Sequence, residues 1–511
     1  MSGRRAKNIG KNSFLSIFSQ LLIIAFGFFS QRVINVKLGT ELVGLNGVIS
    51  NVIAIFSVTE LGLSTAVIFQ LYRALAEENE ERIAALMNLY RKAYSVIALT
   101  IAVIGLLFMP FVHLFLKGNH FALSYVRLIY GLWLARTVFG YLLSYKRAMI
   151  LADQRDYVVS LATMAVSIFQ YGAVIVIVLA TGNYALALGL GVLFEVFVNF
   201  CMLLYVDHAY PYLKKYRKAI CDHRMKKDVF ADVKNLFVTR VAQKFLVSTD
   251  NLIMSSFIGL YITGLYSNYC LITQSLINIL QGLAFSLQPT VGNLLVVHDE
   301  EKEQTYLNSF TFITFYLAAI VFSGVTAVAS YFVGDIWLGR TFLLSWDTVF
   351  LCAANMMLYL LALPMHVFVG AAGLFELEKK VAVTATAANL IVSLVLVTPL
   401  GITGVLLGTS IAYLILIIGK AIGFCKERLN RSATPYLLTI GMYVILAAAE
   451  SFVSMVVVDK WFAHRGILGF LLAGCVCVLI PAVLNFLLFF QSKTFRQLLA
   501  LFHAYRESGR K

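Results

Sequence analysis

The chain has 511 residues, of which 60% are apolar and only 13% are charged, with a formal net charge of +15. Soluble proteins are about 45–50% apolar and about 25% charged, so this composition excludes a soluble enzyme, a secreted disulfide scaffold and a disordered protein. Apolar stretches of about 20 residues, enough for a helix to cross a bilayer, follow one another along the whole chain. The composition therefore predicts an all-α polytopic membrane protein.

Apolar runs bounded by charge, glycine or proline predict fourteen transmembrane helices. Their expected ranges are 12–36, 44–72, 93–116, 122–146, 157–180, 183–207, 231–258, 260–287, 305–333, 345–370, 380–399, 401–424, 434–458 and 466–490. The basic stretch before the first range has no small-residue cleavage site after it, which predicts a retained span and not a signal peptide. The connections are short, so we expect no folded domain outside the membrane.

Lysine and arginine set the expected orientation. With the N-terminus inside, 31 of the 41 basic residues fall on the cytoplasmic side, and Lys420 is counted there with the loop that follows it. Only five lie outside, and five more fall within spans: Arg32, Arg127, Arg136, Arg240 and Lys244. Because cytoplasmic loops carry the excess of positive charge, both termini are predicted to be cytoplasmic. The long basic loop from His208 to Phe230 is interpreted as an anchor on anionic headgroups, with partner binding as the alternative.

A weak internal repeat divides the chain. The segments LGTELVGLNG (Leu38–Gly47) and IGLYITGLYS (Ile258–Ser267) share the pattern G-x-x-x-x-G-L at an offset of 220 residues, and ALALG (Ala185–Gly189) matches GVLLG (Gly404–Gly408) at an offset of 219. The offset spans six helices, an even number, so the halves should have the same orientation and a two-fold axis along the membrane normal.

The repeat and the charge pattern together predict the domain boundaries. We expect an N-lobe over residues 1–212, a basic cytoplasmic loop over 213–230 and a C-lobe over 231–428. Two additional helices over 429–492 and a basic cytoplasmic tail over 493–511 complete the chain.

Three segments carry a family resemblance: the LGTELVGLNG turn, TELGLSTAVIFQLYRALAEEN (Thr59–Asn79) and STDNLIMSSFIGLYITGLYSNY (Ser248–Tyr269). With these segments and its order of six, six and two spans, the chain resembles the multidrug/oligosaccharidyl-lipid/polysaccharide (MOP) exporter superfamily, in particular its polysaccharide-transporter branch. The resemblance implies a flippase in the bacterial plasma (inner) membrane. Such a protein moves a polyprenyl-diphosphate-linked oligosaccharide, a repeat unit of capsule or exopolysaccharide, from the inner to the outer leaflet by alternating access. It also implies membrane lipids and other polysaccharide-assembly proteins as partners, and no nucleic acid.

The seventh expected span is half polar. At 100° per residue its polar side chains fall on one side of the helix, namely Arg240, Gln243, Lys244, Ser248, Asp250 and Asn251. Charged residues in a membrane usually face a cavity or each other, so this side is predicted to line an aqueous cavity. The alternative places Arg240 near the inner headgroups, with Lys244 snorkelling toward it. Asp250, beside Thr249 and Asn251, is the candidate for a coupling ion, Na⁺ or H⁺, and a salt bridge to Lys244 or Arg240 is the alternative.

The first lobe has its own charges in spans: Arg32, Glu60, Arg136 and Glu195. One interpretation is ion pairing between helices, with Arg136 bonded to Glu60 or Glu195. The other is that Arg32 and Arg136, with Arg240 and Lys244, bind the substrate diphosphate, since arginine offers a planar two-point donor. For Arg32, which is nearer the outer face, snorkelling to the headgroups is an equal alternative. The two interpretations are compatible, because a pair can exchange partners during transport.

Three functions are compatible with a polytopic membrane protein: a flippase, a drug antiporter and a membrane-embedded polysaccharide polymerase. A cation-coupled drug antiporter of the same superfamily favours an acidic cavity, whereas the charges expected here are mostly cationic. A membrane-embedded polysaccharide polymerase needs a catalytic surface, and the outer loops are too short to supply one. The sequence contains no P-loop, DxD-type pair, CxxC pair or His/Cys cluster, so we expect no enzymatic activity, metal or cofactor. The flippase is the favoured expectation.

Overall fold

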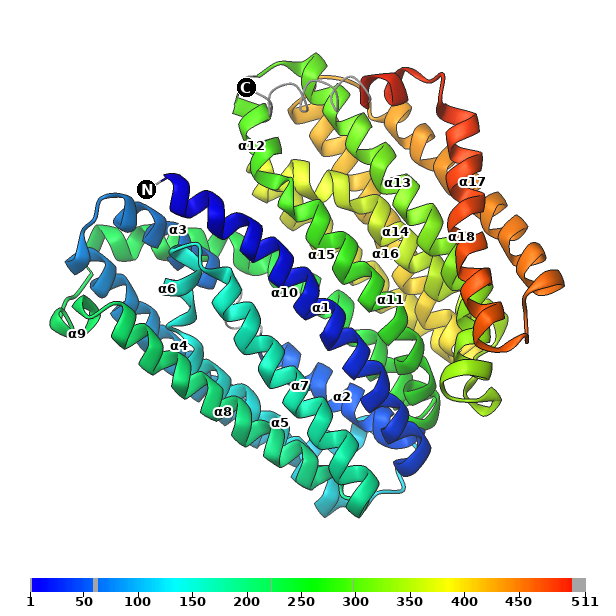
Figure 1. Ribbon diagram of the computed structural model, residues 1–511. Coiled ribbons are helices and arrows are strands. Elements are labelled where there is room, and N and C mark those ends of the chain that lie inside the picture. Colours follow the sequence, from blue (N-terminus) through cyan, green and yellow to red (C-terminus); the bar gives the residue numbers. More distant parts are fainter. Residues whose placement is uncertain (1, 58–62, 222, 297, 499–511) are drawn as a thin grey trace. The chain divides into compact units, whose positions relative to one another are not determined.

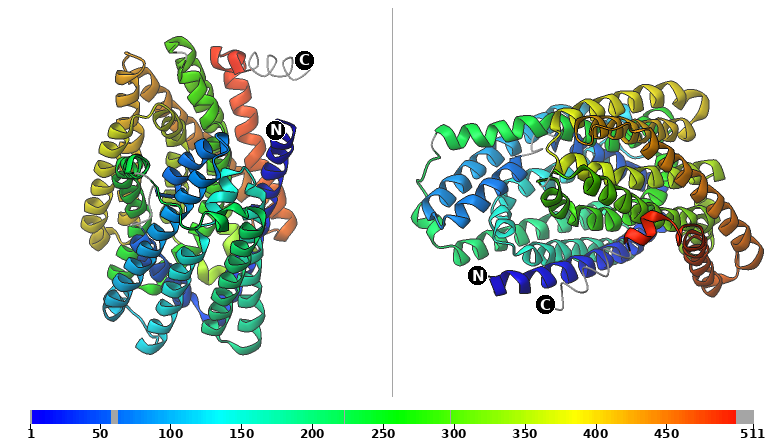
Figure 2. Two further views of the ribbon diagram at one scale, coloured as in Figure 1. Left: turned by 90° about the vertical axis from the view of Figure 1, so that its left-hand side faces the viewer. Right: turned by 90° about the horizontal axis from the view of Figure 1, so that it is seen from above.

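Every regular element in the described part of the chain is helical (Figure 1). The computed structural model describes residues 2–57, 63–221, 223–296 and 298–498. The chain divides into two units, residues 1–267 and 268–511, and each is described by itself. In unit 1, Figures 1 and 2 show the long helices α1, α5, α7 and α8 side by side.

Unit 1 holds the elements up to the start of α11. They are α1 (Ser2–Leu38), α2 (Thr40–Phe56), α3 (Leu63–Ala76), α4 (Glu80–Phe108), the 3₁₀ helix η2 (Met109–Phe115), α5 (Leu123–Ser144), α6 (Arg147–Ala152), α7 (Asp156–Thr181), α8 (Tyr184–Ala209), α9 (Tyr212–Lys215), α10 (His223–Phe257) and the first turns of α11 (Leu260–Ser286). Helix α8 packs against α5 and α7, α1 packs against α7, and α10 packs against α2.

Unit 2 is built around α13. Its elements are the remainder of α11, α12 (Gln288–Val296), α13 (Glu300–Tyr331), the π-helical η3 (Phe332–Trp337), the 3₁₀ helix η4 (Arg340–Phe342), α14 (Trp346–Ala371), α15 (Phe375–Leu400), α16 (Ile402–Glu427), α17 (Thr434–Trp461) and α18 (Gly466–Phe489). Helix α13 contacts α14, α17 and α18, and α15 packs along α16.

Each predicted span has a helical counterpart, but not all form as predicted. Twelve helices in the described part of the chain are long and apolar enough to cross a membrane. The prediction of one helix over 44–72 is wrong, because α2 ends at Phe56 and α3 begins at Leu63, and these helices of 17 and 14 residues are each short for a bilayer. Helix α10 is 35 residues long but too polar to count among the twelve. It begins at His223, inside the segment predicted as a basic loop.

The repeat motif explains how α2 and α11 begin. Gly39 and Gly259 precede these helices with φ of +91° and +132°, a backbone region that favours glycine. The second glycines of the motif, Gly44 and Gly264, lie where the two helices cross. Both are small enough for the backbones to touch, which is how small residues act between membrane helices.

The crossing of α2 and α11 is reciprocal. A Cβ atom at Gly44 would collide with the carbonyl oxygen of Leu260, and a Cβ atom at Gly264 would collide with that of Thr40. Thr40 and Leu260 are themselves 220 residues apart, the offset of the repeat. When residue i contacts j and the equivalent of j contacts the equivalent of i, the two elements are related by a two-fold axis. The contact therefore pairs equivalent positions of the two copies of the motif.

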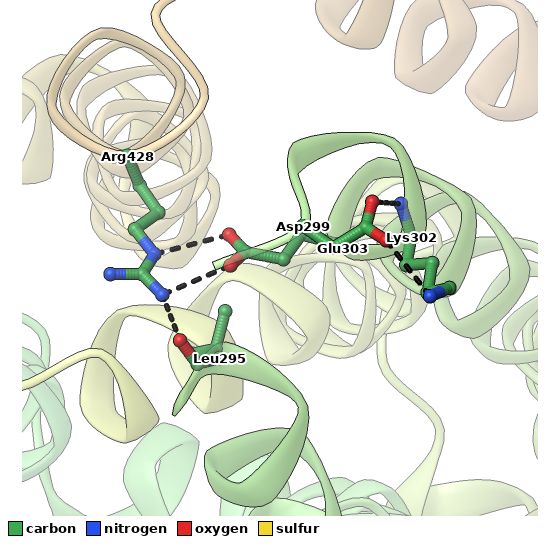
Figure 3. A network of polar contacts seen from close by, with 5 residues as sticks. All are labelled: Leu295, Asp299, Lys302, Glu303 and Arg428. Carbon is green, nitrogen blue, oxygen red and sulfur yellow. Dashed lines mark hydrogen bonds and ion pairs between the residues drawn. The ribbon is translucent and has the colours of Figure 1, made fainter. Parts of the chain in front are cut away.

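An ion pair joins α13 to the end of α16 in unit 2 (Figure 3). The Arg428 guanidinium donates from Nε to Glu303 Oε2 (3.1 Å) and from Nη2 to Oε1 (2.9 Å), and Nη2 also donates to the carbonyl oxygen of Leu295. Beside it, Asp299 caps α13 by accepting the backbone N–H of Lys302. Hydrogen bonds from the Lys302 ammonium and backbone N–H lower the pKa of Asp299.

Candidate functional site

The Arg136 side chain makes an ion pair across the middle of unit 1. Arg136 lies on α5 and donates from Nε to Oε2 of Glu195 on α8, at 2.6 Å. Both side chains are about three-quarters buried, with 27% and 22% of their surface exposed. A charged group near the bilayer centre costs about 2.5–3.5 kcal/mol even on the mildest scale, and pairing reduces that cost. Of the two partners predicted for Arg136, the structure selects Glu195.

Aromatic and polar contacts hold the Arg136 guanidinium in place. Its Cζ lies 5.2 Å from the centre of the Trp133 ring, a cation–π contact. The Trp133 indole N–H in turn donates to Asn46 Oδ1 on α2, at 3.2 Å. The guanidinium is therefore positioned by three helices: its own α5, α8 through Glu195 and α2 through Asn46.

Two further cations bond to the same helix, α8. Arg147 on α6 donates to Asn199 Oδ1 at 2.5 Å, and Lys146 pairs with Asp207. Glu195 and Asn199 are one helical turn apart, so these acceptors follow the face of α8 that α5 and α6 cover. The sequence analysis gave no role to Lys146, Arg147 or Asn199. Lys146 and Arg147 follow Arg136 by ten and eleven residues, and only the packing of the helices shows that they meet acceptors on α8.

A basic pocket of about 400 Å³ lies where α4, α8 and α9 meet. Its charged lining consists of Arg91, Lys146, Asp207, Lys214 and Arg217, so cations outnumber the acid by four to one. The loop at its edge is fixed by Asn88, whose amide donates to the carbonyl oxygens of Arg217 (3.1 Å) and Ala219 (3.0 Å). A pocket with this lining suits a phosphate or another anionic group.

On α10 the predicted polar side chains divide into two groups. Arg240 is exposed and Lys244 is half-buried, whereas Ser248 and Asp250 are buried, Asp250 with 7% of its surface exposed. The C-terminal part of α10 packs on α2, since a Cβ atom at Gly47 would touch Asn251. Ser248 and Asp250 are thus covered by helix packing, whereas Arg240 and Lys244 keep exposed surface.

Two predicted site residues remain, Arg32 and Glu60. Arg32 is exposed on α1. Glu60 lies outside the described residues. The structure therefore brings together Arg136 and Glu195 among the predicted residues of the first lobe.

Unit 2 contains a buried ion cluster that sequence reasoning missed. Lys420 on α16 places its Nζ 2.8 Å from His366 Nδ1 on α14 and 3.3 Å from Glu378 Oε1 on α15. The same Glu378 oxygen lies 3.4 Å from His366 Nε2. Only 1% of the Lys420 side chain is exposed. The sequence analysis counted Lys420 with the following loop, but α16 continues for seven residues beyond it.

The comparisons concern the fold. No family model matches the sequence, and no curated protein matches it. Among solved structures, the lipid II flippase MurJ in an inward closed conformation superposes with a TM-score of 0.67 at 15% identity, over 96% of this chain and 99% of MurJ. An inward-facing multidrug resistance MATE family transporter of the MOP superfamily gives 0.64 at 14% identity, over 82% of this chain and 97% of the transporter. A Vibrio cholerae MATE transporter gives 0.61 at 12% identity, over 84% and 98%.

The chain has the MOP-type fold. The structures it resembles are transporters, as the sequence resemblance implied, and both flippase and drug-transporter forms occur among them.

Proposed function

We propose that this protein is a membrane transporter of the flippase type, which moves a polyprenyl-diphosphate-linked oligosaccharide from the inner to the outer leaflet of a bacterial plasma membrane by alternating access. The extent of the structural similarity carries this proposal. The lipid II flippase matches over 96% of the chain, whereas the MATE transporters match over 82% and 84%. A flippase of a lipid-linked substrate thus accounts for more of this chain than a drug transporter does.

The charges of unit 1 support an anionic substrate. A diphosphate that leaves the headgroup region loses its hydration, and fixed N–H donors must replace it. Arg136 offers a guanidinium near the middle of α5, and the basic pocket beside Lys146 and Arg217 offers four more cations. The polyprenyl tail needs no polar contact, because it can stay in lipid. In this proposal Arg136 exchanges Glu195 for the diphosphate as the substrate passes, and Arg32, Arg240 and Lys244 add positive charge along the route.

Asp250 remains the proposed site of ion coupling. Its carboxyl is buried on α10 next to Thr249, and a buried carboxyl responds either to a proton or to a cation that oxygens can hold. Replacement of Asp250 by Asn should change the dependence of transport on Na⁺ or pH more than it changes the affinity for the substrate.

A paired transport assay tests the function. Purified protein is reconstituted into liposomes and offered either a polyprenyl-diphosphate oligosaccharide or a cationic drug with an imposed ion gradient. Movement of the lipid-linked sugar alone supports the flippase. Movement of the drug alone overturns it in favour of the antiporter, the second function compatible with this fold.

A further inference from the structure

A further buried carboxyl lies on α17 in unit 2. Glu450 is on α17 and has 2% of its surface exposed. It carries the only charge in the sequence between Thr434 and Val458. No ion pair reaches it from any residue of the described part of the chain, so the carboxyl has no cation to offset its burial.

One side chain hydrogen-bonds to Glu450. The amide of Asn485 on α18, itself fully buried, donates from Nδ2 to Glu450 Oε2 at 3.2 Å. The remaining side-chain oxygen of each residue, Glu450 Oε1 and Asn485 Oδ1, is buried and has no hydrogen-bond partner among the described residues. Both are acceptors. A pair of ionised glutamate and asparagine therefore leaves two buried acceptors and one buried charge without compensation, a costly arrangement.

Neighbouring hydroxyl groups do not supply the missing donor. Ser454 donates to the backbone carbonyl oxygen of Glu450 at 2.8 Å, and Ser451 bonds to Thr326 on α13 at 2.5 Å. The Tyr316 hydroxyl, also on α13, donates to the carbonyl oxygen of Ala482 at 2.5 Å.

Nor do charged groups face Glu450 from the helices packed around it. Between Tyr306 and Tyr331, α13 has no acidic, basic or histidine residue, and α18 has none over its whole length. On α17 the nearest titratable side chain toward the N-terminus is Tyr443, whose ring stacks on Phe315. Among the described residues, no side chain of these three helices donates to Glu450 Oε1 or Asn485 Oδ1.

We propose that Glu450 and Asn485 form a proton-binding site. In this site Glu450 is protonated on Oε1, and its O–H donates a hydrogen bond to Asn485 Oδ1. The protonated acid and the primary amide then make two antiparallel hydrogen bonds, each group donating once and accepting once. One proton removes the buried charge and satisfies both acceptors. If the oxygen and nitrogen of the Asn485 amide exchange places, the amide oxygen lies next to Glu450 Oε2. That arrangement also needs a proton between the two oxygens.

Proton binding is thereby coupled to the packing of α18 on α17. Loss of the proton leaves a carboxylate with a single hydrogen bond in an apolar environment, so the helices must separate or admit water. A Na⁺ ion is a weaker candidate for this position, because the pair offers only two free oxygens and hard cations take six or more. The site is separate from the proposed diphosphate route, and its test does not depend on transport.

Infrared spectroscopy of the full-length protein in lipid at neutral pH tests the site. The difference spectrum between the wild type and Glu450→Gln should contain the C=O band of a protonated acid that only the wild type has. The matched control is Glu376→Gln, which removes an exposed carboxylate that pairs with Lys379 at 2.6 Å and should leave the acid band intact. A carboxylate band in the difference spectrum between wild type and Glu450→Gln, or an acid band that disappears on addition of Na⁺, overturns the proposal.

Thermal unfolding at increasing pH gives an independent readout. The Gln side chain supplies permanently the donor that the proton supplies in Glu450. Glu450→Gln should therefore be as stable as the wild type at neutral pH, and more stable than the wild type at alkaline pH, where the wild type loses its proton. If Glu450→Gln does not fold, Asn485→Leu replaces it: a protonated-acid band moved to higher frequency supports the site, and its absence overturns it.

Discussion

At the scale of single residues, the ion pair between Arg136 and Glu195 has a specific role in the proposed function, where a diphosphate competes for the guanidinium. The guanidinium has five N–H donors, and the bond to Glu195 uses the one on Nε. A phosphate that approaches competes with Glu195 for the same positive charge. The carboxylate thus keeps Arg136 compensated in the membrane when no substrate is present, and lowers the affinity when substrate arrives.

Removing the competitor should strengthen substrate binding. In Glu195→Gln we expect the affinity for a polyprenyl-diphosphate sugar to rise about tenfold, roughly 1.4 kcal/mol, which is near the strength of one hydrogen bond to a charged group. Arg136→Ala should weaken binding by a similar factor or more, and Arg136→Lys should recover only part, because an ammonium lacks the planar fork. Fluorescence binding on purified protein measures these values.

The control for these variants is Lys460→Ala, which removes an exposed cation at the end of α17 and should leave binding unchanged. If Glu195→Gln and Arg136→Ala weaken binding equally, the pair holds the helices together and does not exchange partners.

The buried Lys420 cluster makes a prediction about stability. Lys420→Met leaves Glu378 buried without its cation, and breaking a buried pair costs about 3–5 kcal/mol. The double variant Lys420→Met, Glu378→Gln should regain most of this loss, since it buries no charge. Thermal unfolding in detergent measures both, and a single variant as stable as the wild type would show that Lys420 adds nothing.

At the scale of helices, the crossing of α2 and α11 has the tightest requirement. Gly44→Ala and Gly264→Ala each place a methyl group against backbone oxygen, which cannot rotate away, and overpacking of this kind costs about 1–3 kcal/mol. Gly140→Ala on α5 is the matched control, because a Cβ atom there meets nothing within 4 Å. Melting temperature in detergent is the measurement. Equal stability of all three variants would mean that the helices do not cross at these glycines.

The helices were largely predictable from the sequence, because the membrane requires long apolar runs and the runs are visible. The repeat motif aligned Gly44 with Gly264, but the pattern did not predict that the two helices cross at these glycines. The break between α2 and α3 was missed, since apolar residues continue on both sides of it. The start of α10 at His223 was missed because a helix outside the apolar region leaves no hydropathy signal.

The candidate site was predictable only in part, because a hydropathy pattern does not indicate which helices contact one another. Glu60 and Glu195 were equal partners for Arg136 until α5 and α8 were seen to pack. Lys420 resembled a loop cation because it lies close to a basic segment. Glu450 was overlooked because a single acid in an apolar run barely changes the hydropathy of its span.

At the scale of the whole molecule, the proposed transport of an anionic lipid depends on the charges that the fold presents. The lipid II flippase matches nearly the full chain, and cations exceed the acids in the basic pocket of unit 1. A drug transporter for cations would place its excess charge with the opposite sign. The fold alone is compatible with either cargo, so the sign of the charge on the route is what separates them.

The most direct measurement is translocation of a fluorescent polyprenyl-diphosphate oligosaccharide in liposomes that contain the purified protein. The fraction of sugar accessible to an external quencher is followed with time. The wild type should equilibrate the sugar between leaflets, and the folded Arg136→Ala, Arg240→Ala double variant should not. Normal translocation by that double variant, or none by the folded wild type under any ion gradient, would contradict a flippase with a cationic route.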